Sequence, residues 1–113
     1  MKREIIVYTN RFLAFYTEQD NKVQEKIEYV LDLVRFEERV PIKFLKYLEN
    51  TDSIYEVRIN TTFKNIRILC FFDKGNLLVL TNCLVKKAQK TPRKEIIMAE
   101  KLKKAYLTEK YGG

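Results

Sequence analysis

The amino-acid sequence predicts a small domain of the α+β class with the element order β-α-α-β-β-β-α. Apolar residues recur with a helical period over residues 21–37. From residue 55 onward, three segments with strand patterns follow one another without a helix between them, and Thr91-Pro92 then marks the start of a final helix. Because strands joined by short loops pair most simply as antiparallel neighbours, we expect an antiparallel sheet with the two N-terminal helices and the C-terminal helix on one face. A chain of 113 residues can bury one apolar core, so we expect residues 1–113 to form a single domain.

The first 20 residues predict one strand and one short helix. Residues 3–8 are rich in β-branched side chains, which is typical of a strand. Thr9 or Asn10 is the expected N-cap of the helix that follows. The apolar side of that helix consists of Phe12, Phe15 and Tyr16.

The next segment predicts a longer helix over residues 21–37. Asn21 and Gln24 form a capping-box signal at its start. Its apolar stripe consists of Val23, Ile27, Val30, Leu31 and Val34. After Pro41, we expect residues 42–48 to form only a short helical turn that leads into a polar loop.

The three strands differ in how many of their faces they are expected to bury. Residues 55–60 alternate apolar and polar, so one face meets the core and the other is polar. Residues 66–72 place apolar side chains on both faces, with Arg67 as the exception. Residues 77–85 are nearly all apolar, which is typical of an inner strand covered on both sides.

The hairpin between the first two of these strands sets two arginines opposite each other. If Thr61 to Lys64 form a four-residue loop, Arg58 pairs with Arg67 on the polar face of the sheet. Like charges directly opposite each other destabilise a sheet. Either a carboxylate such as Glu56 neutralises the two arginines, or a bound phosphate does.

Composition narrows the functional classes. The chain has no histidine and no cluster of acids at metal-ligand spacing, which argues against a metal site and a cofactor. Cys70 and Cys83 lie in apolar runs and are expected to be buried thiols of a reduced protein. No apolar run reaches the roughly 20 residues needed to cross a bilayer, and no signal peptide is visible. We therefore expect a cytoplasmic protein without a membrane partner.

The excess positive charge is concentrated at the C-terminal end. The net charge is +7, and residues 84–113 alone carry nine Lys/Arg against three Asp/Glu. Five of the cations surround the predicted start of the last helix, where Thr91 is the expected N-cap and Pro92 the first helical residue. A helix N-terminus among cations favours phosphate binding, although a solvated basic turn has the same pattern. These five candidates for RNA binding or phosphate chemistry are Lys86, Lys87, Lys90, Arg93 and Lys94.

Three segments, taken in order, resemble the RelE/HigB toxin superfamily of type II toxin-antitoxin systems, and most closely its branch of phage-derived small toxins. The resemblance covers most of the chain and is strongest over residues 54–107. The segments are Tyr55-Glu56-Val57-Arg58-Ile59, Ile66-Arg67-Ile68-Leu69, and Leu84-Val85-Lys86-Lys87-Ala88-Gln89-Lys90-Thr91-Pro92 with Glu95, Ile96 and Ala99.

This resemblance implies a small RelE-like fold and an mRNA interferase, a ribonuclease that cuts messenger RNA on the translating ribosome. It also implies a cognate antitoxin, usually a helix-turn-helix protein in this branch. The implied catalytic residues are a basic residue at Arg58, a transition-state arginine at Arg67, basic residues at Lys86 and Lys87, and a C-terminal tyrosine, for which Tyr106 and Tyr111 are both candidates.

Chemistry without a metal is consistent with this residue set, because a ribose 2′-hydroxyl can attack the adjacent phosphate with only cations and a proton carrier in place. A lysine crowded by other cations has a lowered pKa and suits that task. Two other functions remain open: a superfamily member that inhibits a DNA topoisomerase by binding, and a plain nucleic-acid-binding module whose basic helix makes the contacts.

Overall fold

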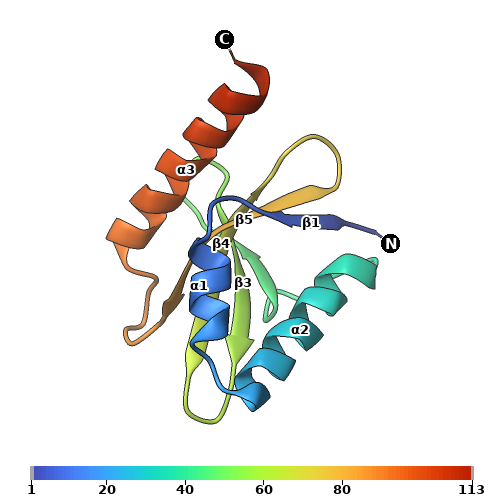
Figure 1. Cartoon of the computed structure of the whole chain (residues 1–113), viewed down its shortest axis with the longest axis vertical. Coiled ribbons are helices and arrows are strands. Elements are labelled where there is room, and N and C mark those ends of the chain that lie inside the picture. The colour runs from blue at the N-terminus through green and yellow to red at the C-terminus, as the bar shows by residue number, and fades with distance from the viewer. Residues whose placement is uncertain (1, 113) are drawn as a thin grey trace.

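The computed structural model describes residues 2–112 and places one sheet between two helical layers, with α3 on one side and α1 and α2 on the other (Figure 1). The α+β class and the predicted helices and strands are confirmed, with one further strand. In chain order, the elements are β1 (Glu4–Val7), α1 (Arg11–Thr17), α2 (Asn21–Phe36), β2 (Leu45–Tyr47), β3 (Tyr55–Asn60), β4 (Asn65–Phe72), β5 (Leu77–Val85) and α3 (Arg93–Tyr111).

The sheet is mixed, whereas an antiparallel sheet was predicted. Its five strands lie in the order β1-β5-β4-β3-β2, and β1 runs parallel to β5. The other neighbours are antiparallel, as the short loops between them predict. The direction of β1 was missed because a β-branched run predicts a strand without predicting its partner. The whole segment from α1 to β4 separates β1 from β5 in the sequence.

The segment 42–48 was predicted as a helical turn, and this prediction was wrong. Residues 45–47 form the edge strand β2, which pairs antiparallel with β3 and sets Lys46 opposite Glu56. The backbone N–H of Arg58 also donates to the carbonyl of Phe44 at 2.7 Å. Apolar residues three apart fit a helical turn or a short strand equally well, and here the hydrogen bonds of β3 decide the outcome.

The helices cover both faces of the sheet, so the prediction of one covered face was also wrong. The apolar residues of α1 and α2 pack against the face that carries Val57, Ile68 and Cys70. Ala99 and Tyr106 of α3 pack against the other face, with Leu69 and Phe71. The reason is that β4 and β5 carry apolar side chains on both faces, and each face has to be shielded from water.

The start of α2 differs from the predicted capping box. Asp20 is the N-cap, and its carboxylate accepts from the backbone N–H of Val23 at 2.9 Å.

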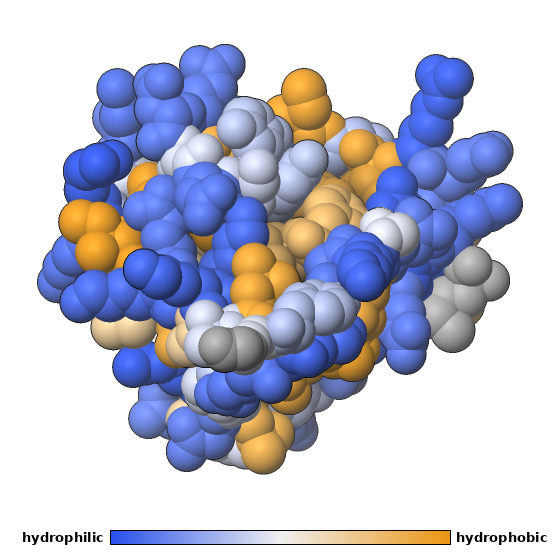
Figure 2. Space-filling model, turned by 90° about the horizontal axis from the view of Figure 1, so that it is seen from above, coloured by the Kyte–Doolittle hydropathy of each residue, from blue (hydrophilic) through white to orange (hydrophobic). Residues whose placement is uncertain are grey.

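Seen from the end of the molecule at which α3 terminates, hydrophilic side chains surround smaller hydrophobic areas (Figure 2). Within residues 2–112, no helix is long and apolar enough to cross a membrane.

Candidate functional site

The β3–β4 hairpin brings Arg58 and Arg67 together, as its predicted register requires. Asn60 pairs with Asn65, and Arg58 with Arg67. The loop from Thr61 to Lys64 is closed by three hydrogen bonds. The Thr61 N–H and hydroxyl donate to the Lys64 carbonyl at 2.8 and 3.1 Å, and the Lys64 N–H donates to the Thr61 hydroxyl at 2.9 Å. Loop length therefore fixes the position of both arginines.

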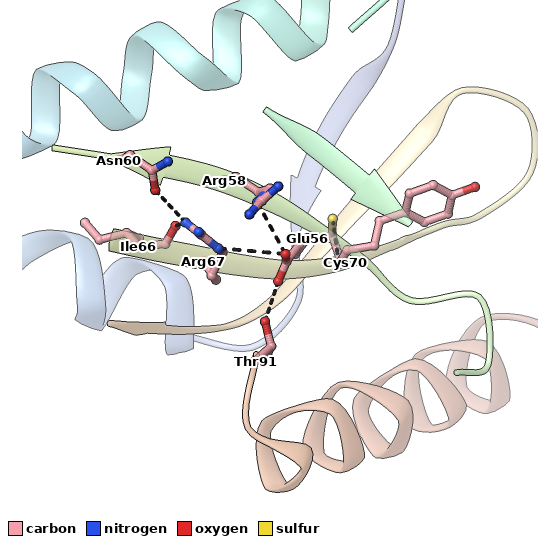
Figure 3. Close-up of polar contacts among 8 residues, drawn as sticks. Glu56, Arg58, Asn60, Ile66, Arg67, Cys70 and Thr91 are labelled. Atoms are coloured by element: carbon pink, nitrogen blue, oxygen red, sulfur yellow. Dashed lines mark hydrogen bonds and ion pairs between the residues drawn. The ribbon is translucent and has the colours of Figure 1, made fainter. Parts of the chain in front are cut away.

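A nearly buried carboxylate lies between these two cations. Glu56 Oε2 is 3.5 Å from Arg58 Nε and 3.8 Å from Arg67 Nε (Figure 3). Only 4% of the Glu56 side chain and 3% of the Arg67 side chain are exposed, against 23% for Arg58. The sequence left two ways to neutralise the opposed arginines, a carboxylate or a bound phosphate. In the structure, the Glu56 carboxylate lies between them. Arg58 is the more accessible of the two cations.

The hydrogen bonding of the guanidinium groups is incomplete. Arg67 Nη1 donates to the Asn60 side-chain oxygen at 2.8 Å and to the Ile66 carbonyl at 2.9 Å (Figure 3). The Nε atoms of Arg58 and Arg67 are buried and have no hydrogen-bond partner. Buried donors are normally satisfied, and an exception often marks a functional position. An oxygen-rich anion is the ligand that two such donors fit best.

Thr91 joins the segment before α3 to this carboxylate. Its hydroxyl donates to Glu56 Oε1 at 2.6 Å. The predicted role of Thr91 as N-cap was therefore wrong: Pro92 occupies the N-cap position and α3 begins at Arg93. The buried carboxylate captures the hydroxyl that would otherwise cap the helix, and this contact holds the basic loop near the arginines.

Lys86 belongs to the same group, and Lys87 differs from it. The Lys86 N–H donates to the Asn65 carbonyl at 2.6 Å, directly beside the arginine hairpin. Burial lowers the pKa of Lys86, and the charge of Arg67 lowers it further. Lys87 is exposed. Glu56, Arg58, Arg67 and Lys86 are called the arginine cluster below.

Lys46 is a cation of this site that the sequence did not indicate. It lies opposite Glu56 in the β2–β3 ladder, and its charge contributes to the lowered pKa of Lys86. No motif identifies Lys46 from sequence, because its position depends on a strand that the sequence analysis did not predict. Only the pairing of β2 with β3 places it on this face.

The remaining predicted RNA-binding residues flank the cluster. Lys90 lies in the loop before Thr91, and Arg93 and Lys94 lie in the first turn of α3. All three are exposed, so they can meet a polyanion without displacing other groups. They extend the positive surface from the arginine cluster along the start of α3.

Tyr106 and Tyr111 lie elsewhere, and the structure does not bring them to the arginines. Tyr106 packs edge-on against Phe71, with the ring centroids 5.3 Å apart. Phe71 lies four residues beyond Arg67 on β4, a separation of about 13 Å in a strand. The hydroxyls of Tyr106 and Tyr111 both donate to Asp73, each at 2.8 Å. These tyrosines fasten the end of α3 to the β4–β5 turn.

Asp73, Cys70 and Cys83 also have shifted pKa values, although they lie outside the arginine cluster. A hydrogen bond from Lys110 at 2.7 Å is the main cause that holds the pKa of Asp73 well below its usual range. Burial raises the pKa of the Cys83 thiol to about 12, and it raises the pKa of Cys70 as well. Neither thiol forms a reactive thiolate near neutral pH. The arginine cluster is therefore the part of the described chain with the clearest capacity for chemistry.

The order and pairing of the helices and strands define a RelE-like fold. The structure is similar to a chain of the archaeal RelE-RelB complex from Pyrococcus horikoshii OT3, with a TM-score of 0.56 and 16% sequence identity. The similarity covers 75% of this chain and 96% of that chain.

The family model described as "Phage derived protein Gp49-like (DUF891)" matches residues 14–104, so the chain belongs to the Gp49-like family. This result confirms the resemblance to the phage-derived branch of the RelE/HigB superfamily that the sequence predicted. No curated protein matches the chain in sequence.

Proposed function

We propose that the protein is the toxin of a type II toxin-antitoxin system and acts as a ribosome-dependent endoribonuclease on messenger RNA. The observation that carries the proposal is the arginine cluster: two opposed arginines with unsatisfied buried Nε donors next to a lysine of lowered pKa. Family and fold support the toxin class. The arginine cluster supports the more specific proposal that this toxin cleaves a phosphodiester bond.

The reaction that suits these residues is an attack within the RNA strand. The ribose 2′-oxygen loses its proton and bonds to the adjacent phosphorus, and the bond from phosphorus to the 5′-oxygen of the next nucleotide breaks. The leaving oxygen takes up a proton, so the products are a 2′,3′-cyclic phosphate and a 5′-hydroxyl end. Arg58 and Arg67 would stabilise the negative charge that develops on the phosphate oxygens. Lys86 would carry a proton, since it lies beside the arginines and burial, followed by the charge of Arg67, lowers its pKa from the ordinary lysine value.

In this mechanism Glu56 competes with the substrate. Its carboxylate holds both guanidinium groups where a phosphate would bind them. A bound phosphodiester would take over one or both contacts and supply acceptors for the unsatisfied Nε donors. Arg58 would make the first contact, because it is the more exposed arginine.

The test separates chemistry from binding. Ribosomes programmed with a defined message are mixed with excess protein, and single-turnover cleavage is followed by primer extension. Arg67→Ala should lower the rate on the order of 100- to 1000-fold, as for the loss of one transition-state donor, and should change ribosome binding far less. Absence of cleavage by the unaltered protein, together with a change in DNA supercoiling, would instead support the topoisomerase-inhibiting function.

We also propose an acidic segment of a cognate antitoxin as the partner of the basic surface. Residues 84–113 carry a net charge of +6, and a stable complex is expected to neutralise it. The dissociation constant of the complex should rise steeply with ionic strength, because exposed charge pairs are screened by salt. Titrations at low and high salt that give the same affinity would contradict this electrostatic account.

A further inference from the structure

A groove of about 470 Å³ lies beside the arginine cluster, between the tip of the β3–β4 hairpin and the start of α2. Figure 1 shows these two segments side by side at the end of the molecule opposite the C-terminus. Phe63 occupies the hairpin tip and is 94% exposed, more than any other large apolar residue that the structure describes. The residues that line this hairpin groove and matter here are Asp20, Lys22, Lys26, Asn60, Thr61 and Phe63.

The hairpin groove is continuous with the arginine cluster through one side chain. Asn60 lines the groove, and its side-chain oxygen accepts the hydrogen bond from Arg67 Nη1 at 2.8 Å. Lys64, at the near end of the same loop, lies three residues before Arg67, a distance of about 10 Å along an extended strand. The groove lies on the α2 side of the sheet and the arginines lie on the α3 side, so a chain of nucleotides with a phosphate on the arginines would pass around the hairpin at Asn60 to reach the groove.

Hydrogen bonds hold the loop that carries Phe63, although the Phe63 ring itself lies in solvent. The Thr61–Lys64 loop is closed by its own hydrogen bonds, at 2.8 and 2.9 Å. Lys64 Nζ also donates to the Gln19 side chain at 2.9 Å, which ties the hairpin to the segment before α2. An aromatic ring this exposed has no role in the core of this fold. Such rings are the platforms on which proteins stack single-stranded bases.

The charges around the ring favour an anionic strand. Lys22 and Lys26 line the groove, and Lys64 lies at its rim. The only acid among the lining residues is Asp20, whose carboxylate already accepts from the Val23 N–H at 2.9 Å. An aromatic platform with cations beside it is the combination that binds single-stranded nucleic acid without a metal.

We propose that Phe63 stacks on the base of a nucleotide next to the phosphate held by Arg58 and Arg67, and that Lys22 and Lys26 bind the backbone on that side. The ligand is single-stranded RNA. The proposal rests on the proposed ribonuclease function, and it assigns to the hairpin groove the positioning of the strand. Phe63 is accordingly a positioning residue, since it touches the substrate away from the reacting atoms.

The first experiment measures cleavage of ribosome-bound message by Phe63 variants. Loss of one base–aromatic stack costs about 1–3 kcal/mol, so Phe63→Ala and Phe63→Leu should raise KM about 5- to 150-fold with a smaller effect on kcat. Phe63→Tyr retains a ring and should restore KM to the wild-type value. Phe36→Ala is the matched control, because Phe36 is 57% exposed and lies at the opposite end of α2. Equal KM values for Phe63→Ala and the unaltered protein would overturn the proposal.

The second experiment does not depend on cleavage. The chain contains no tryptophan, so Phe63→Trp introduces a single tryptophan at the hairpin tip, whose emission can be excited apart from that of the tyrosines. A single-stranded RNA oligonucleotide with 2′-O-methyl groups cannot be cut by 2′-hydroxyl attack, and it should quench this fluorescence, whereas the Phe36→Trp control should stay unquenched. If the unaltered protein does not cleave message, the proposed ribonuclease function is wrong. The quenching experiment then tests by itself whether Phe63 binds single-stranded RNA. Quenching by an apolar peptide but not by the RNA would identify the tip as a protein contact and overturn the proposal.

Discussion

Replacing Glu56 by glutamine should destabilise the fold, even though glutamine has almost the same shape. The amide can still accept the hydrogen bond from Thr91, so the change removes only the negative charge between Arg58 and Arg67. At an effective dielectric constant of about 20, two unit charges 3.5 Å apart attract each other by about 5 kcal/mol before desolvation is counted. Breaking a buried ion pair from one side typically costs 3–5 kcal/mol. Because Arg58 is partly exposed, we expect the lower end, about 3 kcal/mol.

Urea denaturation of the two proteins measures this difference directly. The loss should appear as a lower midpoint with an unchanged slope. It should also lower the melting temperature by about 12 °C, taking roughly 4 °C per kcal/mol for a domain of this size. Thr91→Val is the matched control: it removes the hydroxyl that donates to Glu56 but keeps the charge, and it should cost only about 1 kcal/mol.

A double-mutant cycle shows whether the arginines cause the loss. If their repulsion is the reason, adding Arg58→Gln to Glu56→Gln should recover part of the stability, because one of the opposed cations is removed. A Glu56→Gln protein within 0.5 kcal/mol of the unaltered one would refute the reasoning. The arginines would then be stable without the carboxylate between them.

Three further predictions concern charge. Lys86→Ala should reduce cleavage on the order of 100-fold and Lys87→Ala far less, since Lys86 is half-buried beside the arginines, where burial and the charge of Arg67 lower its pKa, whereas the Lys87 side chain is exposed; equal rates would mean that both are simple anchors. Arg93→Ala should reduce the salt dependence of RNA binding by about one released ion, and an unchanged slope would place Arg93 away from phosphates. The folded pKa of Asp73 is depressed, chiefly by Lys110, so its contribution to stability is present above the unfolded pKa of about 3.9 and is lost as pH falls toward the folded value. Asp73→Asn should therefore be less stable than the unaltered protein at pH 5–8, and the difference between the denaturation curves should begin to shrink only below about pH 4.

The hairpin is the part of the site that sequence reasoning predicted well. The distance between Arg58 and Arg67 in the chain, together with a four-residue loop, is enough to set them opposite each other. The alternation of side chains on β4 likewise predicted which residues share a face, since the period of a strand is fixed at two. Such local rules need no knowledge of the rest of the fold.

What the sequence could not predict depends on partners that are distant in the chain. Lys46 joins the site only because β2 pairs with β3, and Thr91 leaves the N-cap of α3 only because Glu56 lies within reach of its hydroxyl. The apolar side chains on both faces of residues 77–85 indicated a second covered face, but no local pattern specified that α3 is the helix that covers it. Tyr106 was assigned to the site by resemblance, and its hydrogen bond to Asp73 was not visible in the sequence.

The attachment of α3 at both of its ends has a consequence for how the protein opens. Thr91 binds Glu56 just before the helix, and Tyr106 and Tyr111 bind Asp73 near its end. A helix held at one end frays from the other, whereas a helix held at both has no free end from which unwinding can spread. The amide protons of α3 should therefore exchange with solvent as one cooperative group, together with those of β3, which carries Glu56, and of the β4–β5 turn, which carries Asp73.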